Sequence, residues 1–599
     1  MINQTQGKPP VNLEPFLLEV RKPARYIANE VNSIIKEQTA AMINFALCFA
    51  DAYELAMSHL GIKILYSVLN NIDDVYCERC FSPWTDMEEK MREHKIPLFA
   101  LETARPIETY DIVGFSLQYE LGYTNLLNML DLSNIPLAGK DRDMCHPLVI
   151  AGGPCSTNPE PMADFIDVFF VGESEEMIVE FINVFREFKN KQSKNLEIAD
   201  KPELKNKRHE LLNQLAEIPG LYIPRFYNYD KNNVLIPNNA QAAKTVSRRF
   251  VADLDRTVYF TKPPVPYIEI IHDRISIEIM RGCPNQCFFC QAGFTINPVR
   301  IRKVETIMAL AQETYDNTGY DNISFCALSS ANYPYLIELI KTMHAFCHPR
   351  GMGISLPSLR VDPQFLGLIS MLEGLKKSGL TFAPEAGSSR LRKIINKDID
   401  IEALKQAVLE AYRKGWKRLK LYFMVGLPTE TDDDLLEIVK MIEEFSGLRK
   451  TIDGRWGQVS VGISNFIPKA HTPFQWLGMR TIESLQQKQD FLRQRLKRRN
   501  FEVDFHDPEM SFIEACMSRG DRRLGLVIKQ AFDNGARFDA WNGVFDFELW
   551  KQAFSTTGID PGEYVYNQKE FTQPLPWDHI DCGFPKYKLI ENAKISGQR

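Results

Sequence analysis

The first part of the chain alternates short apolar runs with longer amphipathic stretches. The apolar runs have the length of buried strands, and the stretches between them, such as Tyr53–Leu69, repeat their apolar residues at helical spacing. Buried strands that alternate with helices form right-handed βαβ units and therefore a parallel sheet. Strands are expected at Phe45–Ala50, Asp111–Leu117, Pro147–Ala151 and Asp167–Val171. The pattern predicts an α/β domain over residues 37–184, after an N-terminal extension at 1–36.

The alternation of predicted strands and helices is interrupted and then resumes further along the chain. Residues 185–265 are rich in charge and are predicted to form a helical connector. Further βα repeats favour a partial (β/α)6 barrel over residues 266–475, with its reactive face at the carboxyl ends of the strands. These strands are expected at Ser276–Met280, Asn322–Leu328, Gly353–Pro357, Leu380–Pro384, Leu419–Val425 and Val459–Ile467. Residues 476–599 are predicted to form a mainly helical region.

The composition is that of an ordinary globular protein. The 599 residues carry a formal net charge of −6, and 44% are hydrophobic and 25% charged. This balance gives no electrostatic reason to expect a nucleic acid or a membrane as partner. No apolar run reaches membrane-spanning length and no signal peptide is visible, so a cytoplasmic location is expected. In a reducing cytosol the 12 cysteines favour metal ligation or burial over disulfides.

Three cysteines follow directly after the first predicted barrel strand, in the run IEIMRGCPNQCFFCQAGF. Cys283, Cys287 and Cys290 are close enough along the chain to surround one corner of an iron–sulfur cubane, and three ligands leave the fourth iron open. Gly282 permits a sharp turn into the loop. A zinc knuckle is the alternative, but it needs a fourth ligand at matching spacing and no partner pair follows nearby. We therefore predict that the three cysteines hold a 4Fe–4S cluster.

This loop resembles the signature of the radical S-adenosylmethionine (SAM) superfamily, in which three cysteines have this spacing and an aromatic residue precedes the last. The resemblance implies that SAM binds the open iron through its amino and carboxylate groups. It implies that reductive cleavage of SAM gives methionine and a 5′-deoxyadenosyl radical, while the protein positions and shields the reaction. It also implies an electron donor such as a flavodoxin or a ferredoxin.

Later strand ends fit the same resemblance. The runs SFCALSSANY, SLPSLR, FAPEAGSSRLRKIINK and KLYFMVGLPTET stand where the superfamily contacts the methionine, ribose and adenine of SAM. Ordinary turn chemistry is the alternative, because Gly, Ser and Pro are common in such loops. The positions carried over are Ser329 and Ser330 near the amino group, Ser358, Arg360 and Glu385 near the carboxylate or ribose, and Gly426 in a strand-end turn.

A flavodoxin-like (Rossmann-type) sheet ahead of such a barrel resembles the cobalamin (B12)-binding radical SAM proteins. The likeness to one uncharacterised family of that group covers nearly the whole chain and includes FSPWTDME and IAGGPCSTNPEPMADFIDVFFVGE. Backbone N–H groups at Gly152, Gly153 and Gly172 would contact the phosphate of the corrinoid tail. The corrinoid motif Asp-x-His-x-x-Gly is absent, and His59 is interpreted as a packing residue. This departure implies either base-off binding without a histidine ligand or no cobalamin.

Weaker signals have both a functional and a packing interpretation. Cys77 and Cys80 form a lone pair that we interpret as structural, and Cys326 lies near a strand end that faces the predicted reactive pocket. The basic run LRQRLKRRN is interpreted as a solvated helix face, with an RNA-phosphate patch as the alternative. If the C-terminal region covers the barrel mouth, four residues become candidates for handling protons or positioning substrate: Lys469, His471, Asp578 and His579.

The sequence supports three functional hypotheses. The first is cobalamin-dependent methylation of an unactivated carbon by radical chemistry. The second keeps the radical but leads to rearrangement, oxidation or methylthiolation. The third is a cobalamin or redox sensor whose cluster is structural. Small metabolites, lipids, peptides and RNA all stay open as substrates, because substrate choice depends on loops rather than on the fold.

Overall fold

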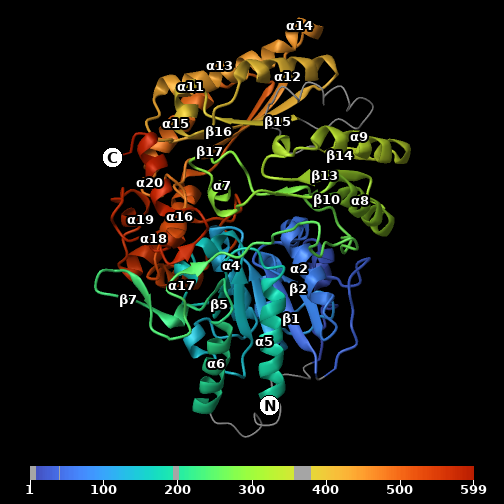
Figure 1. The fold of residues 1–599 in the computed structure, drawn as a ribbon, viewed down its shortest axis with the longest axis vertical. Coiled ribbons are helices and arrows are strands. Elements are labelled where there is room, and N and C mark those ends of the chain that lie inside the picture. Colours follow the sequence, from blue (N-terminus) through green and yellow to red (C-terminus); the bar gives the residue numbers. More distant parts are fainter. Residues whose placement is uncertain (1–8, 40, 193–200, 356–379, 599) are drawn as a thin grey trace.

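Two α/β domains are stacked along the long axis of the molecule, and a helical C-terminal region lies beside both (Figure 1). The computed structural model describes residues 9–39, 41–192, 201–355 and 380–598. The N-terminal domain, in blue and cyan, is at the bottom of the view, and the central domain, in green to orange, is at the top. The C-terminal helices, in red, run along one side of both domains. The three regions therefore meet near the middle of the molecule.

The N-terminal domain is built on a six-stranded sheet in the order β2-β1-β3-β4-β5-β6. The first five strands of this order are parallel, and β6 runs antiparallel to β5. In a doubly wound sheet of this order, ligands bind beyond the carboxyl ends of the strands, where the order changes direction between β1 and β3. The parallel sheet predicted from the sequence is confirmed. Its strands are β1 (Ile43–Phe49), β2 (Val75–Phe81), β3 (Ile112–Ser116), β4 (Leu148–Gly152), β5 (Val168–Phe170) and β6 (Leu221–Tyr222).

Strand β2 is missing from the sequence prediction because charged residues interrupt its apolar pattern. Glu78 and Arg79 are both buried within it. Arg79 pairs with Glu30 at 2.5 Å and with Glu102 at 2.7 Å, and Tyr110 donates a hydrogen bond to Glu78. Charges can be buried when they are paired in this way. A search for apolar runs alone cannot recognise such a strand.

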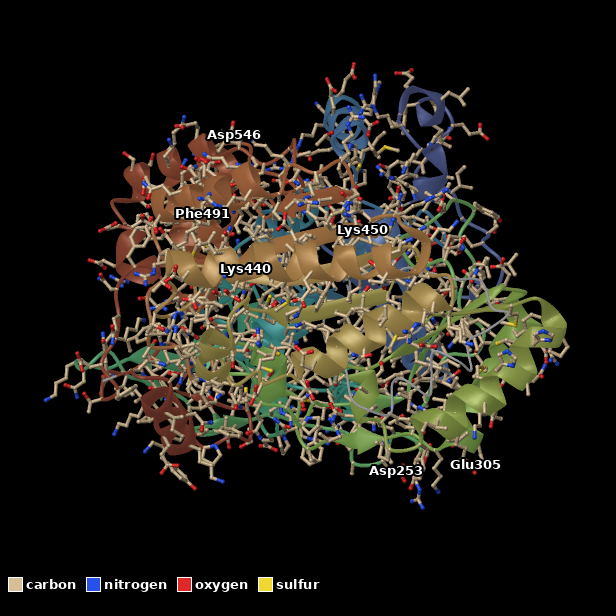
Figure 2. The ribbon with its side chains drawn as sticks, turned by 90° about the horizontal axis from the view of Figure 1, so that it is seen from above. Asp253, Glu305, Lys440, Lys450, Phe491 and Asp546 are labelled. Atoms are coloured by element: carbon tan, nitrogen blue, oxygen red, sulfur yellow. The ribbon has the colours of Figure 1, made fainter. Side chains whose placement is uncertain are left out.

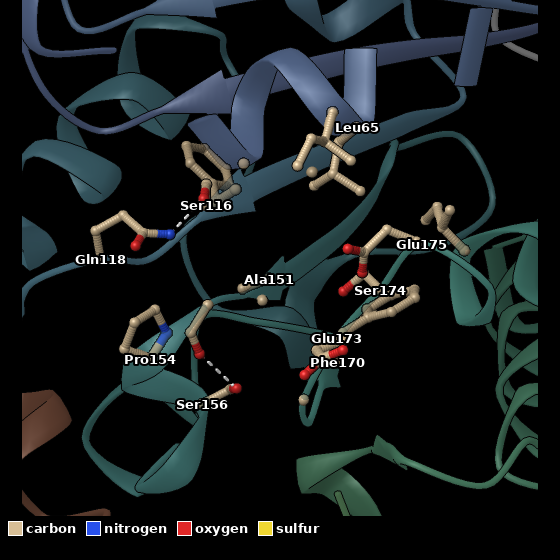
Figure 3. A pocket seen from close by; sticks show the side chains of 18 of the residues that line it. Leu65, Ser116, Gln118, Ala151, Pro154, Ser156, Phe170, Glu173, Ser174 and Glu175 are labelled. Carbon is tan, nitrogen blue, oxygen red and sulfur yellow. Dashed lines mark hydrogen bonds between the residues drawn. The ribbon is translucent and has the colours of Figure 1, made fainter. Parts of the chain in front are cut away.

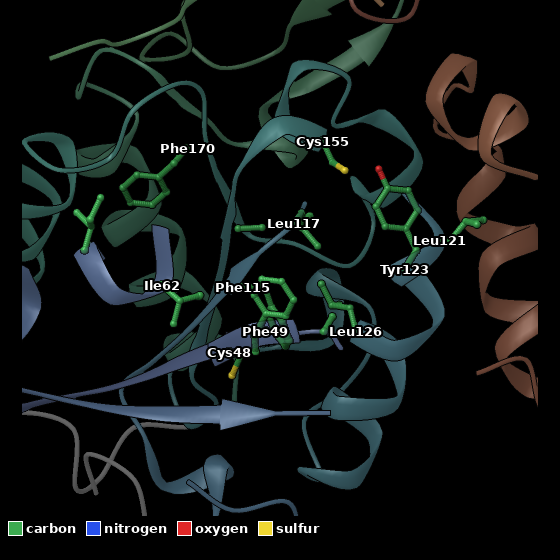
Figure 4. Packing of buried hydrophobic residues seen from close by; sticks show 14 of the residues in the cluster. Cys48, Phe49, Ile62, Phe115, Leu117, Leu121, Tyr123, Leu126, Cys155 and Phe170 are labelled. Atoms are coloured by element: carbon green, nitrogen blue, oxygen red, sulfur yellow. The ribbon is translucent and has the colours of Figure 1, made fainter. Parts of the chain in front are cut away.

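Helices α1 to α5 pack with this sheet around one continuous apolar core. Phe49, Phe115 and Leu126 lie within it (Figure 4). The single helix predicted over Tyr53–Leu69 is broken at His59, whose backbone is extended, with φ −83° and ψ 122°. The helices are α1 (Tyr53–Ser58), α2 (Leu60–Asn70), α3 (Thr85–His94), α4 (Tyr123–Leu132) and α5 (Met177–Gln192).

The segment predicted as a helical connector is only partly helical. Helix α5 continues past residue 184, so the predicted boundary falls inside a helix, and α6 (Lys201–Leu215) follows. Strand β6 then joins the N-terminal sheet, and β9 (Val246–Ser247) pairs with β19 (Ile580–Asp581) near the C-terminus. Strands of two residues leave no periodic pattern, so the sequence does not reveal β6, β9 and β19. The hairpin strands β7 (Tyr227–Tyr229) and β8 (Leu235–Pro237) have three residues each.

The central domain contains two parallel sheets, β10-β13-β14 and β15-β16-β17-β18. The strands predicted from the sequence all occur near their expected positions. Strand β18 lies beyond the predicted boundary at residue 475, in the region expected to be mainly helical. The strands are β10 (Ile275–Glu278), β13 (Asn322–Cys326), β14 (Gly353–Ser355), β15 (Leu380–Glu385), β16 (Arg418–Val425), β17 (Gln458–Asn465) and β18 (Phe501–Phe505).

Helices cover the outer side of the central domain. Seen from above, α13 crosses the molecule with Lys440 on the helix and Lys450 just beyond its end (Figure 2). Two short strands, β11 (Met280–Arg281) and β12 (Arg300–Ile301), form an antiparallel pair beside the cysteine loop. The helices are α7 (Gln291–Thr295), α8 (Val304–Thr318), α9 (Leu336–Cys347), α11 (Ser389–Ile394), α12 (Ile401–Arg413), α13 (Asp432–Leu448) and α14 (Lys450–Asp453).

The rest of the C-terminal region is mainly helical. No helix in the described part of the chain combines the length and the apolar character that a membrane crossing needs. The helices are α15 (Ile482–Arg495), α16 (Pro508–Arg519), α17 (Leu524–Asp533), α18 (Phe547–Thr557), α19 (Gly562–Val565) and α20 (Lys586–Ile595).

Asp167 fixes α6 to the N-terminal sheet. Its fully buried carboxylate pairs with Arg142 at 2.9 Å and with Arg208 of α6 at 2.8 Å. Burial alone would raise the pKa of Asp167, but the charges of Arg208, Arg142 and Arg225 outweigh it and lower the pKa to about 2. The charged form therefore stabilises the fold at pH values above the ordinary pKa of an aspartate.

We expect Asp167→Asn to lower the free energy of unfolding by about 3 to 5 kcal/mol, because it leaves buried guanidinium groups without their counter-charge. Calorimetry near neutral pH would measure the loss as a lower midpoint. In the natural protein the same contribution should be lost as the pH falls from about 4 towards 2. The control is Asp74→Asn, since Asp74 forms an exposed pair with Arg186 and should cost less than about 1 kcal/mol. Equal losses in the two variants would contradict the expectation.

Candidate active site

A cavity of about 410 Å³ lies between the N-terminal sheet and the central domain. Ser116, Ala151 and Phe170, at the carboxyl ends of three strands, line it on one side (Figure 3). Glu278, Arg281 and residues of α7 line it from the central domain. The volume is within the range of about 300 to 1,000 Å³ that is usual for ligand pockets. Neither domain encloses the cavity without the other.

The glycines predicted at strand ends line this cavity. Gly153 has φ +108° and Gly172 has φ +107°, a region that residues with a Cβ atom rarely adopt. A Cβ atom at Gly153 would lie 2.5 Å from the carbonyl oxygen of Leu117. Gly152 also lines the cavity, at the end of β4. The chain therefore exposes backbone to the cavity here without intervening side chains.

The cysteine loop enters the same region through a turn that requires glycine. Gly282, which follows β11, has φ +90°, and a Cβ atom there would lie 2.7 Å from the carbonyl oxygen of Ile296. Within the loop, the N–H of Cys290 donates to the carbonyl oxygen of Cys287 at 2.9 Å. The N–H of Phe288 donates to the carbonyl oxygen of Ile395 at 3.0 Å. The loop is thus wrapped on itself and attached to α11.

The three loop cysteines fit the ligand set of a cubane cluster. Cys283, Cys287 and Cys290 are all free thiols. Burial raises the pKa of the Cys290 thiol, and the charges of Cys283 and Glu385 add to the rise. Among the described residues no three acidic, Cys or His side chains converge on one metal ion. Three cysteine thiolates are the ligand type of a cubane cluster, and the assignment of these three residues to it stays a prediction.

The predicted residues Ser329 and Ser330 lie next to this loop. Ser329 donates to the side-chain oxygen of Asn332 at 2.6 Å, and Asn285 of the cysteine loop donates to the same oxygen at 2.9 Å. Asn285 also lies 3.4 Å from the sulfur of Cys283. Ser330 is buried at the start of the same turn. The sequence analysis did not single out either asparagine.

Glu385 and Gly426 lie at the ends of neighbouring strands. Glu385, at the end of β15, pairs with Lys397 at 2.8 Å, and Lys397 lies over the ring of Phe289 in the cysteine loop. Gly426 follows β16 with φ +83°, and its N–H donates to Glu430 at 2.9 Å. Both strand ends therefore lie on the side of the domain that carries the cysteine loop. The predicted residues Ser358 and Arg360 lie outside the described residues.

A network of ion pairs joins the cavity to the cysteine loop. Arg300 binds both carboxylate oxygens of Glu173, at 2.7 and 2.8 Å. Arg281, two residues before Cys283, pairs with Glu173 at 2.8 Å and with Glu278 at 2.8 Å. Burial would raise the pKa of Glu173, but the hydrogen bond from Arg300 and the charge of Arg281 lower it. Sequence reasoning missed this network because Glu173 and Arg281 are 108 residues apart.

Gln291, directly after Cys290, ties the loop to both neighbouring regions. Its side-chain amide donates to the hydroxyl of Thr157 at 3.1 Å and to the carbonyl oxygen of Ala470 at 3.2 Å. Thr157 lines the cavity, and its backbone carbonyl oxygen lies 2.9 Å from Nε2 of His471. The start of α7 is therefore held between the end of β4 and the end of β17.

The other candidates near the C-terminus make contacts outside the cavity lining. Lys469 pairs with Glu120 at 2.9 Å and with Glu514 at 2.8 Å, so it joins all three regions. Asp578 accepts from the N–H of Leu575 at 2.9 Å and caps a turn. His579 is buried, and burial lowers its pKa to about 4. His471, Lys469, Asp578 and His579 do not line the cavity.

The weaker cysteine and arginine signals lead to packing and surface contacts. Cys77 and Cys80 are buried in β2, and Cys80 is the register partner of Cys48 on β1. Residues three apart in a strand face opposite sides of the sheet, so Cys77 and Cys80 cannot share a metal ion. In the basic run, Arg493 pairs with Asp490 and Arg498 pairs with Glu443.

Models of two protein families match the chain. The model described as radical SAM proteins, N-terminal, matches residues 61–224, and the model of the radical SAM superfamily matches residues 277–442. The second range contains the cysteine loop, and together the two ranges cover more than half of the chain. The chain belongs to the radical SAM superfamily.

Known relatives of this radical SAM protein include an uncharacterised protein of Methanocaldococcus jannaschii. The two are 28% identical over 492 residues, which are 81% of this chain and 90% of the relative. Ribosomal protein uS12 methylthiotransferase RimO of Treponema denticola is 24% identical over 208 residues, which are 29% of this chain and 42% of that protein.

Two solved structures of radical SAM enzymes are similar at a greater distance. The methyltransferase TsrM from Kitasatospora setae, with cobalamin and a 4Fe–4S cluster bound, is 14% identical, and the match covers 74% of this chain and 78% of that chain with a TM-score of 0.47. The cobalamin-dependent enzyme OxsB is 13% identical, covering 87% and 72%, with a TM-score of 0.48. These two likenesses are too distant to carry an argument about this chain.

We expect Gly282→Ala to lose at least half of the iron that the natural protein binds, because the new methyl group would collide with the carbonyl oxygen of Ile296. Iron and sulfide per chain after anaerobic reconstitution would measure this. The matched control is Gly319→Ala, which also has a positive φ but has no atom within 4 Å of the added Cβ. The control should keep its iron and lose only about 1 kcal/mol of stability. Full iron content in Gly282→Ala would contradict the assignment of the loop.

Proposed function

We propose that this radical SAM protein binds cobalamin in the cavity and methylates an unactivated carbon of its substrate. The observation that carries the proposal is the shared wall: strand-end glycines of the N-terminal sheet and the helix after Cys290 line the same cavity. A ligand seated there lies beside the cysteine loop. When bound, the cluster with SAM supplies a 5′-deoxyadenosyl radical, and methylcobalamin supplies a methyl group. Two such reactive groups must lie close together to act on one carbon.

The chemistry of the cavity supports a corrinoid tail as its ligand. One part of its lining is apolar and comes from the sheet and α2, with Phe45, Leu47 and Ile64 among its residues. A flat aromatic base suits such apolar walls. Gly153 and Gly172 also line the cavity, and their backbone N–H groups would meet a phosphate. The apolar walls and the backbone donors thus match the two ends of a nucleotide.

His59 supports binding without a histidine ligand to cobalt. It lines the cavity between α1 and α2, and its ring packs against Phe49 with the centroids 5.4 Å apart. A Cβ atom at Gly61 would lie 2.9 Å from the His59 ring, so the ring is wedged in place. The packing of the ring favours a wall residue, as the sequence suggested.

In the proposed enzyme, the side chains around the cysteine loop position and shield the reactive groups. We infer that the two sheets of the central domain form one partial barrel with the loop at its mouth. Phe288 is buried and packs edge-on against Phe474, so it excludes water beside the three thiols. Ser329, through Asn332, and Glu385, through Lys397, stand next to the loop and would orient the methionine end of SAM.

Methylthiolation is the second candidate, because RimO is a methylthiotransferase and is related to part of this chain. Such an enzyme needs further cysteines for a second cluster. Cys48, Cys77, Cys80 and Cys155 are buried, and Cys145 alone of the N-terminal cysteines is exposed. Buried cysteines spread over several strands do not suit a second cluster, so the arrangement favours methylation.

We expect Leu65→Trp to reduce bound cobalamin at least fivefold and to leave iron unchanged, because the larger side chain fills the cavity (Figure 3). Cobalt and iron per chain, with an ultraviolet-visible spectrum, would measure this after anaerobic purification with cobalamin. The control is Leu526→Trp, at a position that is 59% exposed and outside the cavity. The proposal fails if the natural protein binds iron but no cobalt.

We expect the reduced protein, with cluster and cobalamin, to form 5′-deoxyadenosine and S-adenosylhomocysteine together from SAM. Cys290→Ser should lower the formation of 5′-deoxyadenosine at least 100-fold, because it removes a cluster ligand, while Cys347→Ser on α9 should not change it. Chromatography of the two products would measure both rates. Deoxyadenosine alone would point to radical chemistry without methyl transfer. No cleavage of SAM would favour a sensor with a structural cluster.

A further inference from the structure

Basic side chains are concentrated where the chain enters three neighbouring strands of the central domain. The connections that lead into β16, β17 and β18, at residues 413–418, 449–457 and 495–500, contain eleven lysines and arginines and one acidic residue, Asp453. The whole chain, by contrast, carries a formal net charge of −6. Lys497, Arg498 and Arg499 follow the end of α15, so they lie on a connection and not on the helix face expected from the sequence. We call these three connections the basic edge.

Backbone contacts hold the three connections side by side. The N–H of Gln458 donates to the carbonyl oxygen of Lys417 at 3.0 Å, and the N–H of Val459 donates to that of Asn500 at 3.0 Å. The side chain of Asn500 also donates to the carbonyl oxygen of Gly457 at 2.8 Å. Because neighbouring parallel strands lie only about 4.8 Å apart, the three connections form one continuous surface.

Trp456 brings together two cations of the basic edge that come from different connections. The ammonium nitrogen of Lys450 lies 4.0 Å from the centre of the indole ring, and the guanidinium carbon of Arg498 lies 4.4 Å from it. A cation–π contact at an exposed site contributes about 0.5 to 1 kcal/mol. The indole therefore holds two positive charges close to each other although they repel.

Carboxylates beside the basic edge balance only part of its charge. Three of them form ion pairs with its guanidinium groups, at 2.7 to 3.4 Å: Asp453 with Arg449, Glu443 with Arg498 and Glu410 with Arg413. Seven of its exposed basic residues form no ion pair with any described residue: Lys417, Arg418, Lys450, Arg455, Arg495, Lys497 and Arg499. Cations gathered in this way attract a polyanion, which releases its own counter-ions when it binds.

The basic edge lies at the end of the central domain that faces away from the N-terminal domain. Helix α14, which belongs to it, is at the top of the molecule in Figure 1. Gly426, on the side that carries the cysteine loop, follows the opposite end of β16, whose eight residues span about 26 Å. These cations therefore lie far from the cavity and do not serve the cofactors proposed for it.

The side chains of the basic edge suit a nucleic acid better than a protein. Interfaces between proteins have apolar centres and contain few lysines, whereas protein–nucleic acid interfaces are strongly positive. Within the described basic edge Ile452, at 40%, is the one large apolar side chain that is exposed. A DNA duplex is read by a helix or a β-ribbon that enters a groove, and the only helix here is the four-residue α14. A flexible single strand can follow loops of this kind instead.

We propose that the basic edge binds single-stranded RNA through its phosphate groups. This inference is independent of the proposed function, because the binding needs neither the cluster nor cobalamin. The RNA lies on the far side of the central domain from the cavity, so the surface anchors the RNA and does not contact the reacting atoms.

Fluorescence anisotropy with a labelled oligouridine of about 20 nucleotides would test the basic edge on the full-length protein. We expect a dissociation constant of about 100 µM or below in about 50 mM salt, and a steep loss of affinity as salt is added. The triple variant Lys450→Gln, Lys497→Gln, Arg499→Gln should bind at least tenfold more weakly. The slope of log affinity against log salt should also become shallower by about 2, because three phosphate contacts are lost.

The matched control is the triple variant Lys231→Gln, Lys244→Gln, Lys588→Gln, which changes the net charge equally at three exposed positions outside the basic edge. It should bind the RNA within about twofold of the natural protein, because a surface charge acts mainly within a Debye length of about 10 Å. Equal losses in the two triple variants would overturn the inference, since net charge alone would then explain the binding.

Two competitors distinguish RNA from other partners. Duplex DNA of the same length, or polyglutamate as a model of an acidic protein, should displace the RNA at least tenfold less effectively than unlabelled oligouridine. Stronger displacement by either one would overturn the assignment to RNA. The triple variant of the basic edge should keep the iron and cobalt content of the natural protein. A natural protein that binds RNA but no cobalt would contradict the proposed function and leave this inference standing.

Discussion

The two domains of this radical SAM protein are tied together at the carboxylate of Glu173. This residue follows the strand-end Gly172 of the N-terminal sheet, and its partners Arg281 and Arg300 flank the cysteine loop on β11 and β12. Breaking a buried pair leaves a charge without compensation, which is far more costly than losing a surface pair. This carboxylate therefore contributes to fixing the loop relative to the cavity. Gln291 adds a second contact, because it reaches Thr157 from the other end of the loop.

Features carried by a local pattern were predictable from the sequence. The parallel strands follow from apolar runs, and the cysteine spacing identifies the loop before any fold is known. Strand β2 was not predictable in this way. A charged residue such as Arg79 is expected at the surface, and it is buried here only because the fold pairs it with Glu30 and Glu102. The same reason hides the Glu173 network, in which each partner is more than 100 residues away. Ion pairs between residues far apart in the chain depend on the fold and cannot be recognised from a short stretch of sequence.

The cysteines of this chain lie in different chemical surroundings. Cys48, Cys77 and Cys80 lie inside the N-terminal core, where burial raises the pKa of the Cys77 and Cys80 thiols well above the ordinary value. Such thiols are inert and act as small apolar side chains. In the cysteine loop Cys283 and Cys290 are partly exposed and Cys287 is buried. Burial alone therefore does not distinguish the loop cysteines from the core cysteines, whereas their position on a loop rather than within a strand does.

The buried guanidinium groups of the molecule are stabilised by protein oxygen atoms. Arg519 is fully buried without an acidic partner among the described residues, but its guanidinium donates to the carbonyl oxygens of Leu477 and Asn567. Arg142 and Arg208 share Asp167 and also donate to carbonyl oxygens. The N–H groups that make these bonds exchange water for protein oxygen, which offsets the loss of hydration. The carbonyl groups that accept from each guanidinium therefore contribute to holding the surrounding chain segments in place.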